Sequence, residues 1–251
     1  SYIEEDIKLI ESVKPNVVVG DFRLSLSVSA RLKKVPYFNI TNSYWSPFGH
    51  QNFALAESMA ADIFGYPIAN AVFLCLRPFF FRIHTRSINR LRKRFGLPQT
   101  CPDIRWTYTD GDFVLYGDIA ELFSMPGLPA NHFHLGPILW EPPAPLPDWW
   151  GQLQYEKRVM LYVSFGSTGN ENLIPVIIDS VRDMNVVLVI ARGDFNIEDR
   201  PQENVFTAPA LPGRKCMRFC SAAIFNGGAG TAFQAICEGK PLLGIVSNMD
   251  Q

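Results

Sequence analysis

Short apolar runs bounded by turn residues recur along this 251-residue chain, with helical patterns between them. The runs cover residues 17–19, 36–40, 113–116, 159–163, 186–190, 222–225 and 242–246. Segments such as 24–34 and 172–182 carry the apolar spacing of helices. Strands this short and this apolar are typical of parallel sheets that helices cover on both faces. The sequence therefore predicts an α/β fold.

A proline-rich segment separates the first group of runs from the second. It holds four prolines between residues 141 and 148, and it favours an extended linker because proline continues neither a helix nor a central strand. We expect an N-terminal domain over 1–140, a linker over 141–150 and a C-terminal domain over 151–251. Two doubly wound domains joined in this way would face each other across a ligand-binding cleft.

Charge and cysteine usage argue against several classes of protein. The formal net charge is −1 and the isoelectric point is near 6.4, so nucleic acid is not expected as a partner. The five cysteines form no CxxC pair, so neither a disulfide framework nor a metal site is expected. Cys216 and Cys220 should share a helix face and be buried. A reducing cytoplasm is the simplest compartment.

The segment 68–97 is the longest helix-like stretch, with apolar residues crowded first and basic residues later. Its apolar runs are shorter than the roughly 20 residues that a membrane span needs, so no transmembrane helix is expected. A basic amphipathic helix can lie on anionic lipid, although a solvated face that covers a core is commoner. The start of the chain carries no initiator Met and no apolar secretion signal.

A glycine-rich turn follows the apolar run at 222–225 and leads into a helical pattern that stops before Pro241. Glycines let the main chain approach a ligand closely, and the first turn of a helix presents N–H groups to an anion. The turn therefore indicates a phosphate cradle, to which Thr231 can add a hydroxyl donor. The alternative is a tight connection without a ligand.

Over residues 226–251 the chain resembles the donor-binding signature of family-1 glycosyltransferases, which include UDP-glucuronosyl, UDP-glucosyl and bacterial macrolide-type enzymes. The match consists of Asn226, Gln234, the Gly239–Pro241 turn and the final Asp250-Gln251 pair. The resemblance implies that Gln234 reaches the ribose and that Asp250 and Gln251 grip the sugar. It also implies a diphosphate site formed by Asn226, Gly227, Gly228, Gly230 and Thr231. The family usually has His and Glu where Asn226 and Gln234 stand, so charge assistance is lost at both positions.

Two further segments resemble parts of the family's donor domain. Residues 161–168 resemble its first strand and loop, which places Gly166, Ser167 and Thr168 at the diphosphate. The alternative for the hydroxyl residues is a helix N-cap. Leu211 stands in the loop that packs on the base in the family, although an ordinary turn explains the segment equally well.

Asp21 ends an apolar run, and the family carries an aspartate there that orients a catalytic histidine. An N-cap is the alternative role. The histidine belongs to a region upstream of Ser1, so the base is expected to be absent from this chain. His50 is the least implausible substitute, and a loop histidine that lines the acceptor or is merely exposed is the preferred interpretation. Tyr44 and Trp45 are weak candidates for the acceptor cleft.

The resemblance implies a GT-B fold, with two Rossmann-like, doubly wound domains that are both incomplete here. It implies an inverting enzyme of bacterial secondary metabolism, which transfers a hexose from a UDP- or TDP-sugar to a hydroxyl of a lipophilic small molecule. Neither a metal nor a covalent cofactor is required. The chain by itself is expected to be inactive. The alternatives are an epimerase or lipid-linked sugar transferase of the same fold, and a non-catalytic subunit that binds nucleotide sugar.

Overall fold

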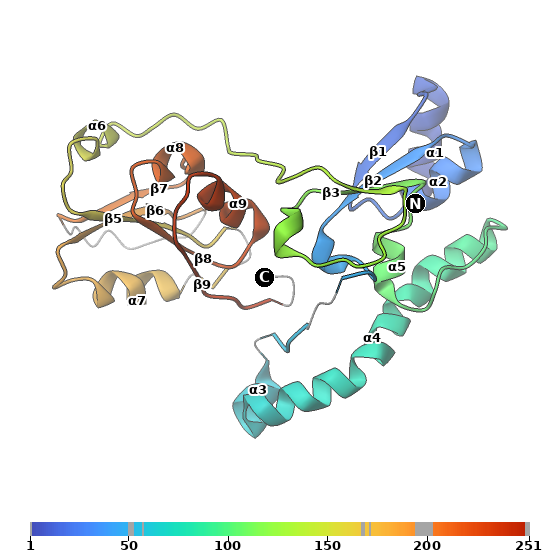
Figure 1. The fold of residues 1–251 in the computed structure, drawn as a ribbon, viewed down its shortest axis with the longest axis horizontal. Helices are drawn as coiled ribbons and strands as arrows, with labels where there is room; N and C mark the ends of the chain where they lie inside the picture. Colours follow the sequence, from blue (N-terminus) through green and yellow to red (C-terminus); the bar gives the residue numbers. More distant parts are fainter. Residues whose placement is uncertain are drawn as a thin grey trace. The chain divides into compact units, whose positions relative to one another are not determined.

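The computed structural model describes residues 2–49, 53–56, 58–166, 169–170, 172–193 and 203–248. The chain divides into two compact units, Ser1–Ile138 and Leu139–Gln251 (Figure 1). Each unit contains a parallel β-sheet and helices, so the predicted α/β class is confirmed. The expected bounds of the domains and the linker stay a prediction.

The sheet of the first unit has four strands in the order β1-β2-β3-β4, all parallel. Its strands are β1 (Val18–Asp21), β2 (Tyr37–Thr41), β3 (Phe113–Tyr116) and β4 (His132–His134). The helices are α1 (Tyr2–Val13), α2 (Leu26–Lys33), α3 (Met59–Phe64), α4 (Tyr66–Arg94) and α5 (Ile104–Tyr108), with 3-10 turns η1 (Ser43–Trp45) and η2 (Ala120–Leu122). Ile3, Val28 and Ile88 join α1, α2 and α4 in one apolar cluster.

β1 lies at one end of this strand order, and β2 is its partner. Val17 and Val19 are 48% and 55% exposed as a result. β1 confirms the strand expected around the apolar run 17–19, and Asp21 is its last residue, whose role in orienting a histidine stays a prediction. Apolar composition alone does not distinguish an edge strand from a central one.

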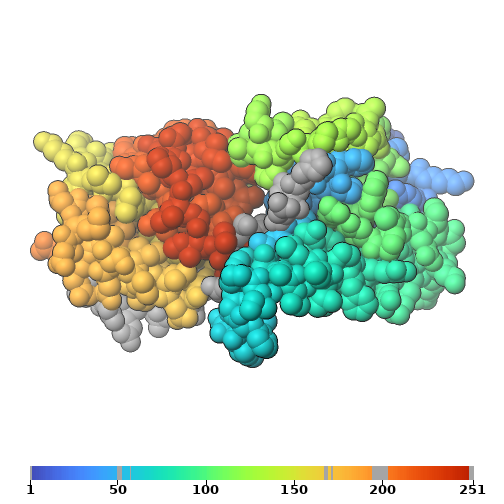
Figure 2. All heavy atoms as spheres, turned by 60° about the horizontal axis from the view of Figure 1, so that its bottom comes forward, coloured from blue at the N-terminus to red at the C-terminus, as the bar shows by residue number. Residues whose placement is uncertain are grey.

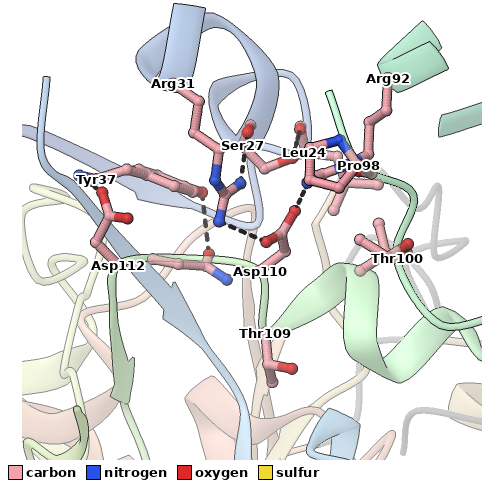
Figure 3. A network of polar contacts seen from close by, with 12 residues as sticks. Leu24, Ser27, Arg31, Tyr37, Arg92, Pro98, Thr100, Thr109, Asp110 and Asp112 are labelled. Atoms are coloured by element: carbon pink, nitrogen blue, oxygen red, sulfur yellow. Dashed lines mark hydrogen bonds and ion pairs between the residues drawn. The ribbon is translucent and has the colours of Figure 1, made fainter. Parts of the chain in front are cut away.

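A buried ion-pair network joins α2, α4 and the turn before β3 (Figure 3). Asp110 accepts hydrogen bonds from Arg31 Nη2, at 2.6 Å, and from Arg92 Nη1. Arg31 Nη1 also donates to Ser27 O, and Arg92 Nε donates to Pro98 O, both at 2.6 Å. Burial lowers the pKa of Arg92, and the charge of Asp110 opposes this shift. The network therefore fixes the last turns of α4 to the rest of the unit.

α3 and α4 form a helical hairpin whose corner is Gly65, with a φ of +79° that favours glycine. α4 spans 29 residues and confirms the long helix that the sequence predicts. In Figure 1 it runs from α3, which lies away from the sheet of its own unit, to the region of α5. None of the helices in the described ranges combines the length and hydropathy needed to cross a bilayer.

The sheet of the second unit has five parallel strands in the order β7-β6-β5-β8-β9. They are β5 (Val159–Ser164), β6 (Val186–Ala191), β7 (Val205–Ala208), β8 (Ala222–Phe225) and β9 (Leu242–Gly244), and the helices are α6 (Trp150–Leu153), α7 (Leu173–Ser180), α8 (Gly213–Met217) and α9 (Ala229–Cys237). Successive residues of β6 enter two separate apolar clusters, Val187 and Val189 in one, Leu188 and Ile190 in the other. The sheet is therefore covered on both faces, as the sequence predicts.

Candidate functional site

The second sheet has a topological switch point between β5 and β8. From β5 the chain adds β6 and β7 on one side and then returns to add β8 on the other side. Connections that leave in opposite directions open a crevice at the carboxyl ends of the two strands, where α/β proteins bind ligands. Ser164 and Phe225 are paired at these ends. The segments that follow them, Gly166 and Asn226 to Gly228, therefore border the crevice.

Asn226 connects these two segments through opposite ends of its side-chain amide. Its Oδ1 accepts a hydrogen bond from the Gly228 N–H at 3.2 Å. A β-carbon added to Gly166 would lie 3.6 Å from Asn226 Nδ2, so the nitrogen is on the side of the β5 loop. The residue is 6% exposed. Its amide thus shapes the glycine turn and lies against the neighbouring strand end.

Glycines follow three adjacent strands at this edge. Gly193, Gly166 and Gly227 come after β6, β5 and β8, and their φ values are +64°, +56° and +87°. These conformations are strained for residues with a side chain. A β-carbon on Gly193 would lie 3.9 Å from the Gly166 carbonyl oxygen, so two of the loops approach closely. The loop after each of these three strands therefore carries a glycine whose own main chain has no β-carbon in the way of a ligand.

α9 begins at this edge, with Gly228 as its N-cap in an extended conformation. Gly230 and Thr231 lie in its first turn, and a β-carbon on Gly230 would meet no atom within 4 Å. The first turn of a helix leaves N–H groups without intrahelical partners and carries a partial positive charge. Together with Asn226, this helix start can hold an anion without a charged side chain.

The side chains of Gln234 and Leu211 are both buried. Gln234 is 9% exposed, and its Nε2 donates to the carbonyl oxygen of Trp140 at 2.5 Å. Its contact with a ribose stays a prediction. The Leu211 side chain is buried in the apolar cluster with Cys216 and Cys220, both of which are buried as expected.

Several sequence-predicted site residues lie outside the described residues. These are Ser167, Thr168, Asp250 and Gln251 on the donor side and His50 on the acceptor side. Their expected roles stay predictions.

In the first unit, an aromatic cluster begins beside Asp21. Phe22 has a left-handed φ of +49°, and its ring lies 4.8 Å from the ring of Tyr108. Tyr108 in turn contacts Trp45 edge to face at 5.0 Å. Trp45 stacks on Phe53 at 5.1 Å between ring centroids. The strand end that carries Asp21 is thereby connected to Trp45 by aromatic contacts.

Sequence reasoning missed Phe22 and Tyr108 as members of this aromatic cluster. The sequence offered a signal for Phe22, because this residue directly follows Asp21. Tyr108 offered no such signal, since it lies in α5 and meets Trp45 only through the fold. Tyr44 was expected with Trp45, and its ring lies 6.0 Å from that of Trp45.

A buried polar layer holds the turn that carries Tyr44 and Trp45. Asp118 accepts a hydrogen bond from the Ser43 main chain, and the Tyr116 hydroxyl lies 2.9 Å from Ser46 Oγ and 2.8 Å from His132 Nδ1. Burial raises the pKa of Asp118 and lowers that of His132. Among the described residues no group of three or more acidic, His or Cys side chains is arranged as a metal site. Hydrogen bonds of this layer to Ser43 and Ser46 hold the turn in place.

Comparison with known proteins identifies homologues over the whole chain. The PGL/p-HBAD biosynthesis glycosyltransferase of Mycobacterium tuberculosis is 39% identical over 250 residues, which are 100% of this chain and 58% of that protein. The PGL/p-HBAD biosynthesis rhamnosyltransferase of Mycobacterium bovis is 35% identical over 100% of this chain and 56% of its own length. An inactive PGL/p-HBAD biosynthesis glycosyltransferase of M. bovis is 41% identical over 72% of this chain and 49% of its own length.

Solved structures show the same fold at lower identity. The glycosyltransferase SnogD of Streptomyces nogalater matches 97% of this chain and 58% of its own, with a TM-score of 0.64 and 18% identity. A Streptomyces glycosyltransferase complexed with thymidine diphosphate matches 99% and 56%, with a TM-score of 0.60 and 17% identity. The spinosyn rhamnosyltransferase SpnG complexed with spinosyn aglycone matches 99% and 58%, with a TM-score of 0.62 and 18% identity.

The chain is thus a homologue of glycosyltransferases and has the GT-B fold class that the sequence predicts. The resemblance to family-1 glycosyltransferases is confirmed. No family model matches the chain. The chain spans 58% of the length of the M. tuberculosis relative and 56% of the M. bovis rhamnosyltransferase.

Proposed function

We propose that this chain is part of an inverting glycosyltransferase that transfers a hexose from a UDP- or TDP-sugar to a hydroxyl group of a lipophilic small molecule. One observation carries the proposal: Asn226, Gly166 and the start of α9 meet at the switch point of the second sheet. Homology to named glycosyltransferases over the whole chain supports it.

The diphosphate lies, in this proposal, over the first turn of α9. Main-chain N–H groups and the helix dipole receive its charge, and Asn226 Nδ2 donates a neutral hydrogen bond. This arrangement stabilises the negative charge that develops on the leaving diphosphate. The solved structure of the same fold that is complexed with thymidine diphosphate supports the TDP-sugar of the two proposed donors.

The acceptor lies against the aromatic surface of Phe22, Tyr108 and Trp45. Aromatic side chains supply large apolar contact area, which suits a lipophilic molecule with a reactive hydroxyl. The spinosyn aglycone bound by a relative of the same fold supports this choice. Tyr44 extends the surface beyond Trp45, along the turn that Asp118 holds.

The reaction begins when a base takes the proton of the acceptor hydroxyl. Asp21 orients the imidazole of a histidine outside these 251 residues and stabilises the imidazolium that forms. The activated oxygen attacks the anomeric carbon opposite the diphosphate, a C–O bond forms as the bond to the diphosphate breaks, and the configuration inverts. Five free cysteines support a reducing, cytoplasmic location.

The test extends the polypeptide to the length of its relatives and supplies UDP- and TDP-hexoses with phenolic and aliphatic alcohols. We expect transfer with inverted anomeric configuration, measured by NMR of the product. Asp21→Asn should lower kcat by about 100-fold or more while donor affinity is unchanged, because general-base catalysis is lost. Transfer with retention, or full activity of the Asp21 variant, would contradict the proposal. Donor binding without transfer to any acceptor would favour the non-catalytic binding subunit.

A further inference from the structure

α4 exposes an apolar stripe along the side that faces away from its own unit. Helical spacing of three and four residues places Ile68, Val72, Leu76, Phe79 and Ile83 on one stripe. These side chains are between 38% and 62% exposed. Their stripe is about 22 Å long at 1.5 Å per residue. Figure 2 shows the side chains of α3 and α4, in cyan and teal, at the surface.

The packed side of α4 is a different one. Phe81, Thr85, Ile88 and Arg92 are buried and also follow helical spacing. A surface helix ordinarily buries its apolar stripe and exposes polar residues. α4 buries Phe81 and Ile88 but leaves a second apolar stripe uncovered. Contiguous exposed apolar surface of this kind marks an interaction site.

The charge of α4 identifies the kind of partner. Its 29 residues include seven Arg or Lys and no Asp or Glu. The stripe continues from Ile83 into Arg86 and Arg90, with Arg82 beside it. These three arginines are exposed and form no ion pair with any described residue. A partner that covers the whole stripe must therefore be apolar against its first half and anionic against its second half.

We propose that α4 binds the surface of an anionic phospholipid bilayer, with its axis in the membrane plane. The apolar stripe enters the boundary between headgroups and acyl chains, and the arginines contact lipid phosphates. Exposed Met59 and Ile63 of α3 extend the apolar area. Asp62 is the one acidic residue in α3 and α4. The inference is independent of the donor site and of the reaction.

Vesicle co-sedimentation of the 251-residue chain tests the proposal. We compare phosphatidylcholine vesicles with vesicles that also contain phosphatidylglycerol, at low and high salt. Binding should require the anionic lipid and weaken in high salt, because salt screens exposed charges. Absence of binding to anionic vesicles at low salt would overturn the proposal.

Two variants separate the apolar and charged contributions. Val72→Ser with Phe79→Ser should abolish binding without lowering the melting temperature, because both side chains are exposed. Neutralising Arg82, Arg86 and Arg90 to Gln should weaken binding by at least about tenfold. A matched control neutralises the same number of exposed charges elsewhere, with Lys8→Gln, Lys34→Gln and Lys157→Gln.

The control variant with three lysines replaced should bind anionic vesicles as the wild type does. An equal loss of vesicle binding in the arginine variant and in the lysine variant would show a general charge effect and contradict a role for α4.

Sedimentation velocity tests whether the stripe binds a second copy of the chain. A chain that dimerises through this stripe, loses the dimer in the Val72→Ser, Phe79→Ser variant and binds no vesicles would assign the surface to a second copy instead.

Discussion

Asn226 caps the main chain of Gly228, with a hydrogen bond of 3.2 Å from the Gly228 N–H to the side-chain Oδ1. The oxygen of the amide is therefore committed to the turn, while the nitrogen lies on the side of Gly166. The two ends of the amide thus lie toward different loops, at a position where the family usually has a histidine. A neutral side chain at this position therefore shapes the glycine turn.

Gly228→Ala should obstruct the start of α9 without unfolding it. Its φ and ψ of −67° and 136° suit any residue, but the new β-carbon would lie 3.2 Å from Asn226 Oδ1. We expect binding of UDP and TDP to weaken by about tenfold, the effect of losing one hydrogen bond to a charged group. Gly151→Ala is the matched control, because its β-carbon would meet nothing within 4 Å. Equal affinities of the two variants would contradict the placement of the diphosphate.

Asp110→Asn should destabilise the first unit strongly. Arg92 is 5% exposed at its side chain and would keep its charge with a neutral partner. Breaking one member of a buried ion pair costs about 3–5 kcal/mol. Urea unfolding measures this loss in the free energy of unfolding. Glu11→Gln, which removes the exposed pair with Lys33, should cost less than about 1 kcal/mol. Similar decreases in the free energy of unfolding in the two variants would show that burial does not strengthen the contribution of the Asp110 ion pairs.

Asp118 should make stability fall as pH rises. Burial raises its pKa in the folded state above the unfolded value, so the folded state binds the proton more tightly. This contribution is fully present below about pH 4 and is lost as the pH rises through the folded pKa. Asp118→Asn removes it but keeps an acceptor for the Ser43 N–H. The melting temperature of the variant, relative to wild type, should therefore increase with pH above about 4. A difference that decreases with pH would contradict this sign.

The cysteines should fall into two reactivity classes. Burial raises the pKa of Cys216 and of Cys220 to about 12, so their thiolate fraction near neutral pH is very small. Cys75, Cys101 and Cys237 are exposed. Alkylation with iodoacetamide at pH 8, followed by mass spectrometry, should modify these three quickly and the buried pair only on unfolding. Fast modification of Cys216 would contradict its buried position.

The sequence predicts the central strands well because their apolar runs are long and bounded by turn residues. It misses β4 and β7 for different physical reasons. β4 has three residues, two of them histidines, and its pairing with β3 depends on the fold rather than on its own composition. β7 is a half-buried strand next to β6, and its apolar content is split by Thr207.

The glycine turn between β8 and α9 is predictable for a similar reason, since glycine turns after apolar strands are local signals. The hydrogen bond from the Gly228 N–H to Asn226 Oδ1 is not predictable in this way, because it depends on the conformations of the turn and of the Asn226 side chain. The sequence also gives no sign of the hydrogen bond from the Gln234 amide to the Trp140 carbonyl oxygen, because the two residues are far apart along the chain. The aromatic surface could not be predicted from the sequence, because it is formed by tertiary contacts of Tyr108 with Phe22 and Trp45.

The most direct test of the donor site is calorimetric titration of UDP and TDP into the wild-type chain and into Asn226→Asp. The aspartate keeps an oxygen that caps Gly228 and favours a helix N-terminus, so the melting temperature should be unchanged or higher. It replaces the donor nitrogen with negative charge, so we predict measurable wild-type binding and affinity at least about tenfold lower in the variant. Equal affinity of the two proteins, with the turn intact, would contradict the claim that this cradle holds the donor diphosphate.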